Sequence, residues 1–177
     1  MAHTHPDGFE PEFLERLKDI FEHRIVFNQL LGLRVDTMQS DGVGAHIEMR
    51  HDLIGHFAHQ RMHGGVISAG LDAMGGLAVM AAIGARHLDE PVMQRLQRFG
   101  KLGTIDLRVD YLRPAIGERF ELRAQVLRLG SRVASTRMSS SRRTAGCCRR
   151  EQGLTSCPDG TSLAGTEGYP HSNGGTR

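Results

Sequence analysis

The sequence predicts an α+β fold in which one long, buried helix is covered by an antiparallel sheet of about five strands. Residues 66–85 carry a single charge, at Asp72, and are otherwise apolar or small. A helix that is apolar on nearly all sides is typical of a protein core. On both sides of it, short segments alternate apolar and polar residues, which is the period of strands that bury one face. A hairpin, a helix and then a strand meander give the order of an α+β domain.

The first 24 residues predict an amphipathic helix that packs onto the core. Pro11 suits a first helical turn. Apolar residues then recur at helical spacing between charged ones: Phe13, Leu14, Leu17, Ile20 and Phe21. A second short helix is expected over 25–31, ending at Gly32.

Two strands follow, at 33–40 and 43–50, around the dipeptide Asp41 and Gly42. Asp-Gly is typical of a type I′ hairpin turn. Residues 51–63 then form a loop rich in His, and the long helix begins at about Gly64. After that helix, 86–101 reads as a polar, mobile connection.

Three more strands are expected in the second half of the chain. Residues 105–112 alternate apolar and polar side chains up to Pro114, where a strand should end. Residues 120–126 alternate in the same way, Gly130 turns the chain, and 132–138 begin the last strand.

The final 39 residues, 139–177, read as a disordered and atypical tail. They are rich in Ser, Thr, Gly and Arg and contain only Leu154, Leu163 and Tyr169 as large apolar groups. Such a segment cannot bury enough surface to offset its ordering entropy. We therefore divide the chain into an amphipathic helix (1–24), a folded domain (25–138) and a tail.

Charge and cysteine usage exclude several classes of function. The tail holds five Arg and three acids, which leaves 17 basic and 17 acidic residues in 1–138. A neutral body does not offer the phosphate contacts that nucleic-acid binding needs. All three Cys lie in the tail, so the body has no thiol nucleophile, disulfide or Cys-ligated metal.

No secretory signal is visible at the N-terminus, and a cytoplasmic location is expected. Residues 66–85 are long enough to span a bilayer. A central Asp costs about 2.5–3.5 kcal/mol on insertion scales, so we expect a core helix and no membrane span.

The residues best suited to catalysis or ligand binding lie between His56 and Asp72. Gly64 and Gly65 stand where a loop becomes a helix, so unpaired amides at the positive end of the helix dipole can bind an anion or polarise a carbonyl. Asp72 lies two turns further along an otherwise apolar helix. A carboxylate in that position is paired, hydrogen-bonded or functional.

Two stretches resemble the hotdog-fold acyl-CoA thioesterases, of the phenylacetate-pathway (PaaI-like) type. The first, HGGVISAGLDAMGG, covers residues 63–76, and the second, GTIDLRVDYLRP, covers 103–114. The resemblance extends over about 25–138. It implies a hotdog fold and a homodimer or dimer of dimers with active sites at the subunit interface. It implies hydrolysis of acyl-CoA to a free acid and CoA without a cofactor.

The resemblance also implies roles for individual residues. Asp72 would act as general base or nucleophile, and the Gly64 amide, with His63 and Gly65 beside it, would hold the thioester carbonyl. Thr104 stands where the family has a Ser or Thr that assists the water or the acid. His56 stands near where many members have an Asn. Two further positions match residues that contact CoA, Tyr111 and Arg128.

Other interpretations stay open at this point. Asp72 could be a structural acid that caps a backbone group or pairs with an Arg. Strand parity puts Thr104 off the apolar face, where it would be a simple β-former. His56, His59 and His63 have spacings that could bind Zn²⁺, but no suitable fourth ligand is evident and no metal is expected. The whole protein could instead be a non-catalytic acyl-CoA-binding protein, or a hotdog hydratase or dehydratase.

Overall fold

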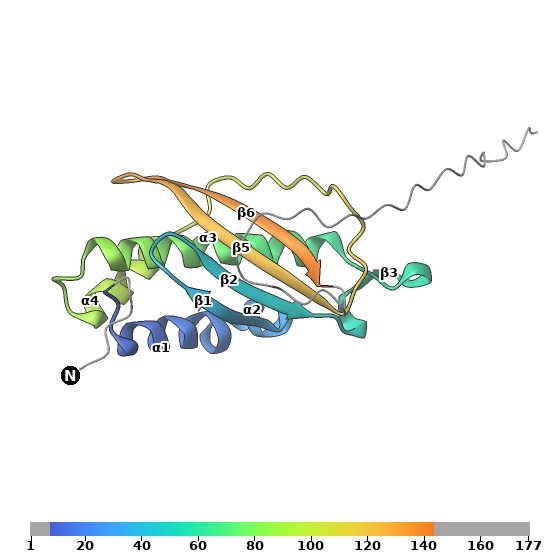
Figure 1. The fold of residues 1–177 in the computed structure, drawn as a ribbon, viewed down its shortest axis with the longest axis horizontal. Helices are drawn as coiled ribbons and strands as arrows, with labels where there is room; N and C mark the ends of the chain where they lie inside the picture. Colours follow the sequence, from blue (N-terminus) through green and yellow to red (C-terminus); the bar gives the residue numbers. More distant parts are fainter. Residues whose placement is uncertain (1–7, 144–177) are drawn as a thin grey trace, which may run out of the picture. The chain divides into compact units, whose positions relative to one another are not determined.

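The computed structural model describes residues 8–143, which form one helix-and-sheet unit (Figure 1). In chain order the helices are α1 (Pro11–Asp19), α2 (Val26–Leu31), α3 (Gly64–Arg86) and α4 (Val92–Gln97), with a π-helical turn at Ile20–Arg24. The strands are β1 (Leu33–Met38), β2 (Val43–Glu48), β3 (Ile54–His56), β4 (Arg61–Met62), β5 (Arg119–Leu129) and β6 (Ala134–Arg143). The predicted α+β class is confirmed.

The main sheet has the order β1-β2-β5-β6 and is antiparallel throughout. Its inward residues face α3, as the cross-strand pair Ile47 and Phe120 illustrates. Four of the five predicted strands therefore form, and each lies within a few residues of its predicted position. The two short strands β3 and β4 make a separate hairpin just before α3, in the stretch that we expected to be a loop.

Helix α3 lies against one face of this sheet and supplies much of the core. Met74, Leu77 and Met80 are fully buried. The sheet comes so close that a Cβ on Gly70 would lie 2.8 Å from Leu122 Cδ1. By length and composition alone α3 could cross a membrane; in the structure its sheet-facing side packs in the core.

Helix α1 covers a second side of α3 through apolar residues on one of its faces. The buried residues are Phe9, Phe13, Leu17 and Phe21. Helix α4 contacts α1 through Arg95. The Arg95 guanidinium lies 4.6 Å from the centre of the Phe13 ring and binds Glu10. The hydrogen bond from Arg95 holds the pKa of the Glu10 carboxyl below its ordinary value.

Three details differ from the sequence-based expectations. The 86–101 connection contains α4 and a 3₁₀ turn (Arg98–Lys101), because Arg95 and Leu96 are buried. The β1–β2 hairpin closes with a bond from Gln39 N–H to Gly42 O (2.9 Å), and neither Asp41 nor Gly42 has the positive φ of a type I′ turn. Strand β6 continues to Arg143, so the sheet extends past the predicted start of the tail, and the rest of that tail lies outside the described residues.

The largest difference concerns the predicted third strand, which does not form. Within the described part of the chain, residues 103–113 make no backbone–backbone hydrogen bond, and Figure 1 shows them as a trace without an arrow. Leu107 and Val109 are half-buried while their neighbours are exposed. The strand-like alternation is thus present without a paired neighbour, and the main sheet has four strands.

Candidate active site

The N-terminus of α3 leaves one backbone amide available. His63 is the N-cap residue, and its Nδ1 accepts a hydrogen bond from Gly65 N–H (2.9 Å). Val66 N–H bonds to the His63 carbonyl (3.0 Å). Gly64 N–H has no partner among residues 8–143. The first turn therefore presents a free donor at the positive end of the helix dipole, at the residue predicted to hold a carbonyl.

The same bond defines the state of the His63 side chain. A ring nitrogen that accepts a hydrogen bond carries no proton, so the neutral imidazole has its proton on Nε2. His63 thereby both fixes the conformation of the Gly64–Gly65 turn and keeps an Nε2–H donor. This capping role was not foreseen, because His is not among the common N-cap residues.

Asp72 and Thr104 are brought together, as predicted. The Thr104 hydroxyl donates to Asp72 Oδ1 over 2.6 Å. Asp72 is partly buried, and no Arg or Lys forms an ion pair with it in the described residues. Within residues 8–143, the alternative of an Asp–Arg structural pair is therefore not realised. A hydroxyl that binds one carboxylate oxygen leaves the other oxygen free and its direction fixed.

Tyr111 anchors the other end of the 103–113 segment to the helix start. Its hydroxyl donates to Gly64 O (2.9 Å), and its ring lies 3.3 Å from the position of a Cβ on Gly64. Thr104 and Tyr111 thus place one extended segment along α3, from Asp72 back to the N-terminus. Thr104 is exposed, as strand parity predicted, yet it binds Asp72, because the segment is not a strand of the sheet but lies along α3.

We call one stripe of α3 its open face, since these residues stay partly exposed on the side away from the sheet: Gly65, Ser68, Asp72, Gly76 and Val79. Their spacing places them on one side of the helix. All but Asp72 are small or apolar. The only carboxylate in α3 therefore stands in the middle of a surface that lacks competing charges.

Helix α2 is preceded by the π-helical turn with Phe21, whose ring lies 3.9 Å from a Cβ position on Gly76 of the open face. The polarity of α2 is inverted. Asn28 is 3% exposed, and its side chain donates to Phe21 O (3.0 Å). The apolar residues face outwards with exposed fractions of 75% for Val26, 56% for Phe27 and 64% for Leu30.

Two predicted site residues are not brought to the others. His56 lies in the β3–β4 hairpin, where its ring stacks on Phe57 and His59 and its Nδ1 is buried without a partner in the described residues. It makes no hydrogen bond there with Asp72 or Gly64. Arg128 is exposed near the end of β5, where the next residue's carbonyl binds Arg86 at the far end of α3.

The chain also has a shallow hollow of about 430 Å³, which none of the predicted site residues lines. Its walls are Met49, Arg50, His51, Ile54, Gln60, Ile116 and Gly117. Between residues 8 and 143, no group of three or more His, Cys, Asp or Glu side chains is placed to hold a metal ion.

Comparisons with known proteins identify the family of this chain. A family model described as the thioesterase superfamily matches residues 59–140. The medium/long-chain acyl-CoA thioesterase YigI of Escherichia coli is 34% identical over 125 residues, which cover 71% of this chain and 81% of YigI. The chain belongs to the thioesterase superfamily. The family match includes His63, Gly64, Asp72, Thr104 and Tyr111, which the structure assembles around α3.

Solved structures of thioesterase-superfamily proteins share the fold. A protein from Shewanella oneidensis related to this superfamily is 40% identical, with a TM-score of 0.70 over 74% of this chain and 86% of its own. Zebrafish thioesterase superfamily member 2 is 20% identical, with a TM-score of 0.57 over 75% of this chain and 88% of its own, and that likeness concerns the fold alone. The prediction of a thioesterase is confirmed.

Proposed function

We propose that this thioesterase hydrolyses acyl-CoA to a free acid and CoA, with Asp72 as the group that activates or performs the attack. The observation that supports this proposal is that one helix carries both an oriented carboxylate, at Asp72, and a free amide, at Gly64. Hydrolysis of a thioester needs both a base or nucleophile and a donor for the developing oxyanion. The name of the relative YigI extends the proposal to medium and long acyl chains.

The two groups of one chain cannot serve the same thioester. Asp72 lies eight residues after Gly64, so their backbones are separated by about 12 Å along the helix axis. The reacting carbon must lie about 3 Å from the nucleophile while its oxygen meets the amide donor. We therefore include a homodimer in the proposal, in which Gly64 of one copy and Asp72 of a second copy act on one substrate.

The chemistry assigned to these residues is as follows. Gly64 N–H binds the thioester oxygen and stabilises the negative charge that forms on it. Asp72 takes a proton from a water whose oxygen bonds to the carbonyl carbon. Alternatively, an Asp72 oxygen forms that bond first, and after CoA has left a water hydrolyses the resulting anhydride, which releases the acid and restores Asp72. In both routes the carbon–sulfur bond breaks, and the CoA thiolate leaves and takes up a proton. Thr104 orients the Asp72 carboxylate in either case.

The remaining predicted residues have supporting roles in this proposal. His63 holds the Gly64–Gly65 turn and offers Nε2–H near the carbonyl, and Tyr111 braces the helix start from outside. His56 needs a movement of its hairpin to reach the substrate. Arg128 is exposed and free to meet a phosphate of CoA. We place the enzyme in the cytoplasm, where CoA thioesters are made and used and where tail cysteines stay reduced.

The direct test is release of CoA from a panel of acyl-CoAs, followed by mass spectrometry, for the wild type and Asp72→Asn. We expect kcat/KM to fall about 1,000-fold in the variant, the size of effect of a general base. Asp41→Asn, in the β1–β2 turn, is the matched control and should behave as wild type. Binding of acyl-CoA without turnover by the wild type would reject hydrolysis in favour of a binding protein.

A further inference from the structure

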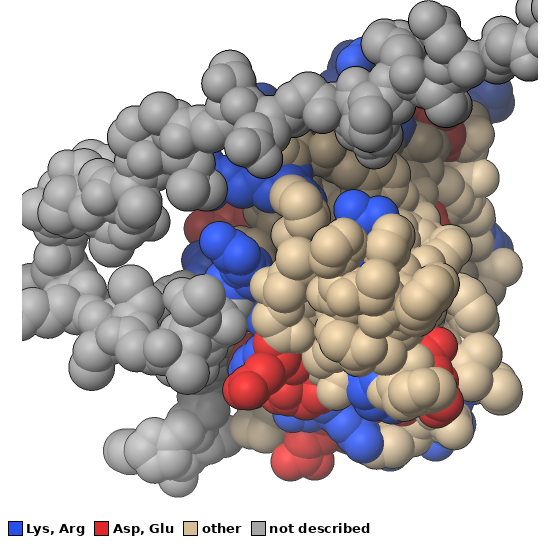
Figure 2. Space-filling model, turned by 90° about the vertical axis from the view of Figure 1, so that its right-hand side faces the viewer, with Lys and Arg blue, Asp and Glu red and all other residues tan. Residues whose placement is uncertain are grey.

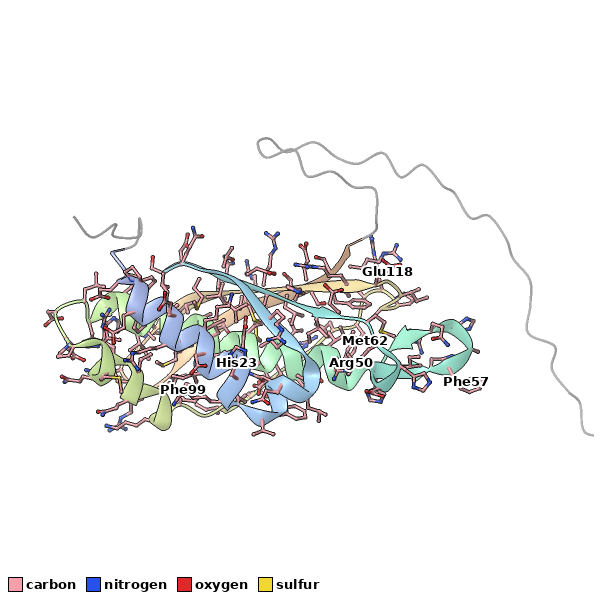
Figure 3. All side chains as sticks on the ribbon, turned by 90° about the horizontal axis from the view of Figure 1, so that it is seen from below. His23, Arg50, Phe57, Met62, Phe99 and Glu118 are labelled. Atoms are coloured by element: carbon pink, nitrogen blue, oxygen red, sulfur yellow. The ribbon has the colours of Figure 1, made fainter. Side chains whose placement is uncertain are left out.

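The β3–β4 hairpin projects from the end of the molecule and presents an aromatic side chain. Phe57 lies at its outer tip (Figure 3) and is 84% exposed. The rings of His56 and His59 stack on each other, with centroids 4.7 Å apart, and support the tip from behind. Figure 2, which views this end, shows a central surface with few charged side chains and charges around its edge. A large exposed aromatic in such a setting is typical of an interaction site.

The exposed apolar surface of α2 is the second such feature. We call Val26, Phe27 and Leu30 the α2 patch. Helix α2 buries an Asn and exposes these three residues, which is the reverse of a surface helix in a monomer. No residue between 8 and 143 covers the patch. Phe57 and the α2 patch are thus two of the exposed apolar surfaces of each chain, beside others such as Ile105 and Leu112 on the 103–113 segment.

The α2 patch lies beside the part of α3 that holds Asp72. Phe21, in the π-helical turn five residues before the start of α2, lies close to Gly76. Arg50 binds the last carbonyls of α2, including Leu31 O at 3.3 Å. Arg50 itself lies just before the segment that connects β2 to α3. Asp72 lies one helical turn before Gly76 and is bound by Thr104, so the turn that leads into α2 contacts the same part of α3.

A dimer with shared sites brings the two features together. This step rests on the proposed function, which pairs Gly64 of each copy with Asp72 of the other. A twofold axis can do this only if the two α3 helices cross antiparallel near Ser68, the midpoint between the two residues. The hairpin that precedes Gly64 of one copy must then extend beyond Asp72 of the second copy, towards Gly76 and the turn at Phe21 that leads into the second copy's α2.

We propose that Phe57 of each copy packs on the α2 patch of the other and closes one side of the shared active site. The contact is isologous, because each copy supplies one Phe57 and one patch. An aromatic residue buries about 150–250 Å², so the two contacts supply part of an interface of standard size, and the α3 crossing supplies more. Packing there also excludes water beside Asp72, which strengthens the electrostatic effect of the site.

The test introduces opposite charges on the two surfaces and measures dimerisation of the full chain by analytical ultracentrifugation. Phe57→Glu and Phe27→Arg each place a charge in the contact, so each should weaken dimerisation at least tenfold, as loss of an aromatic anchor does. The double variant pairs the two new charges across the interface and should recover much of that loss. Recovery requires that the two new charges touch. Positions 57 and 27 lie on separate elements of one chain, so in the proposed dimer they touch only between copies.

Val133→Glu, in the β5–β6 turn, is the matched control, since Val133 is 58% exposed and lies outside the contact. It should leave dimerisation unchanged, and circular dichroism checks the fold of every variant. Unchanged association in both single variants, or no recovery in the double variant, would overturn the proposal. So would a loss confined to the hydrolysis of long acyl chains in Phe27→Arg, because the patch would then bind substrate.

Failure of this contact can be distinguished from failure of the proposed function. Association is measured without substrate, so a dimer built on Phe57 and the α2 patch stands even if no acyl-CoA is hydrolysed. An enzyme that hydrolyses acyl-CoA through Asp72 and dimerises without these surfaces would reject only the contact.

Discussion

The two sides of α3 are built differently although they belong to one helix. The side towards the sheet carries large side chains that are fully buried, such as Met74, Leu77 and Met80. The open face carries small residues and one carboxylate, and it stays partly exposed. Stability is therefore concentrated on one side and chemistry on the other. Mutations on the two sides should separate these properties.

The largest expected effect is on the buried side. Leu77→Ala removes a fully buried side chain, and we expect the free energy of unfolding to fall by about 2–5 kcal/mol. Val79→Ala, on the open face, is the comparison and should cost less than about 1.5 kcal/mol. Denaturant unfolding measures both. Equal losses would show that the open face is as important to folding as the buried one.

The next effect concerns the free amide at the helix start. Gly64→Pro removes the N–H at the first helical position, where Pro is tolerated, and the extended ψ of His63 (134°) suits a residue before Pro. We expect kcat to fall about 100-fold, as for loss of one oxyanion donor. Gly64→Ala keeps the amide and should retain most activity, after a small shift of the Tyr111 ring. Equal activity of both variants would remove this amide from the mechanism.

A smaller effect is expected at Thr104. Thr104→Val keeps the shape but loses the bond to Asp72, so kcat should fall about tenfold, near the net value of a hydrogen bond to a charged group. Thr104→Ser keeps the hydroxyl and should restore kcat. If Ser were as impaired as Val, the side chain would act through packing and not by orienting the carboxylate.

The smallest effect lies away from α3 and affects stability only. Arg95 lowers the pKa of Glu10, so the pair stabilises the fold above the ordinary pKa of 4.5, and this contribution is lost as the pH falls through the lowered value. Glu10→Gln should be less stable than wild type by under about 1 kcal/mol near pH 7, since Glu10 is partly exposed. The difference should vanish in acid. If the difference in stability persisted at acid pH, it would come from the packing of Glu10 and not from the ion pair.

Sequence patterns predicted the parts of the fold that local periodicity controls. The length of α3 and the four strands follow from alternation and helical spacing, which buried faces impose. Helix α4 and the turn at Asp41 were not predicted correctly, because Arg95 and the surrounding strands determine them through contacts distant in sequence. The inverted polarity of α2 is also invisible to a rule that places apolar residues inside.

The candidate site was found mainly through resemblance. Gly64 and Asp72 stand out by position, but Thr104 and Tyr111 were named only because two stretches resemble a family. Parity placed Thr104 off the apolar face but could not reveal its contact with Asp72, since alternation says which side a residue faces but not whether a strand pairs. The capping bond of His63 and the exposure of Phe57 needed the coordinates.

The central claim is that each active site uses Gly64 of one copy and Asp72 of the other. Gly64→Pro and Asp72→Asn should each be nearly inactive alone. Mixed, unfolded together and refolded in equal amounts, they form hybrid dimers in which one of two sites has both intact groups. The account predicts recovery of about a quarter of wild-type hydrolysis. A mixture no more active than its components would contradict it and place both groups of a working site in one chain.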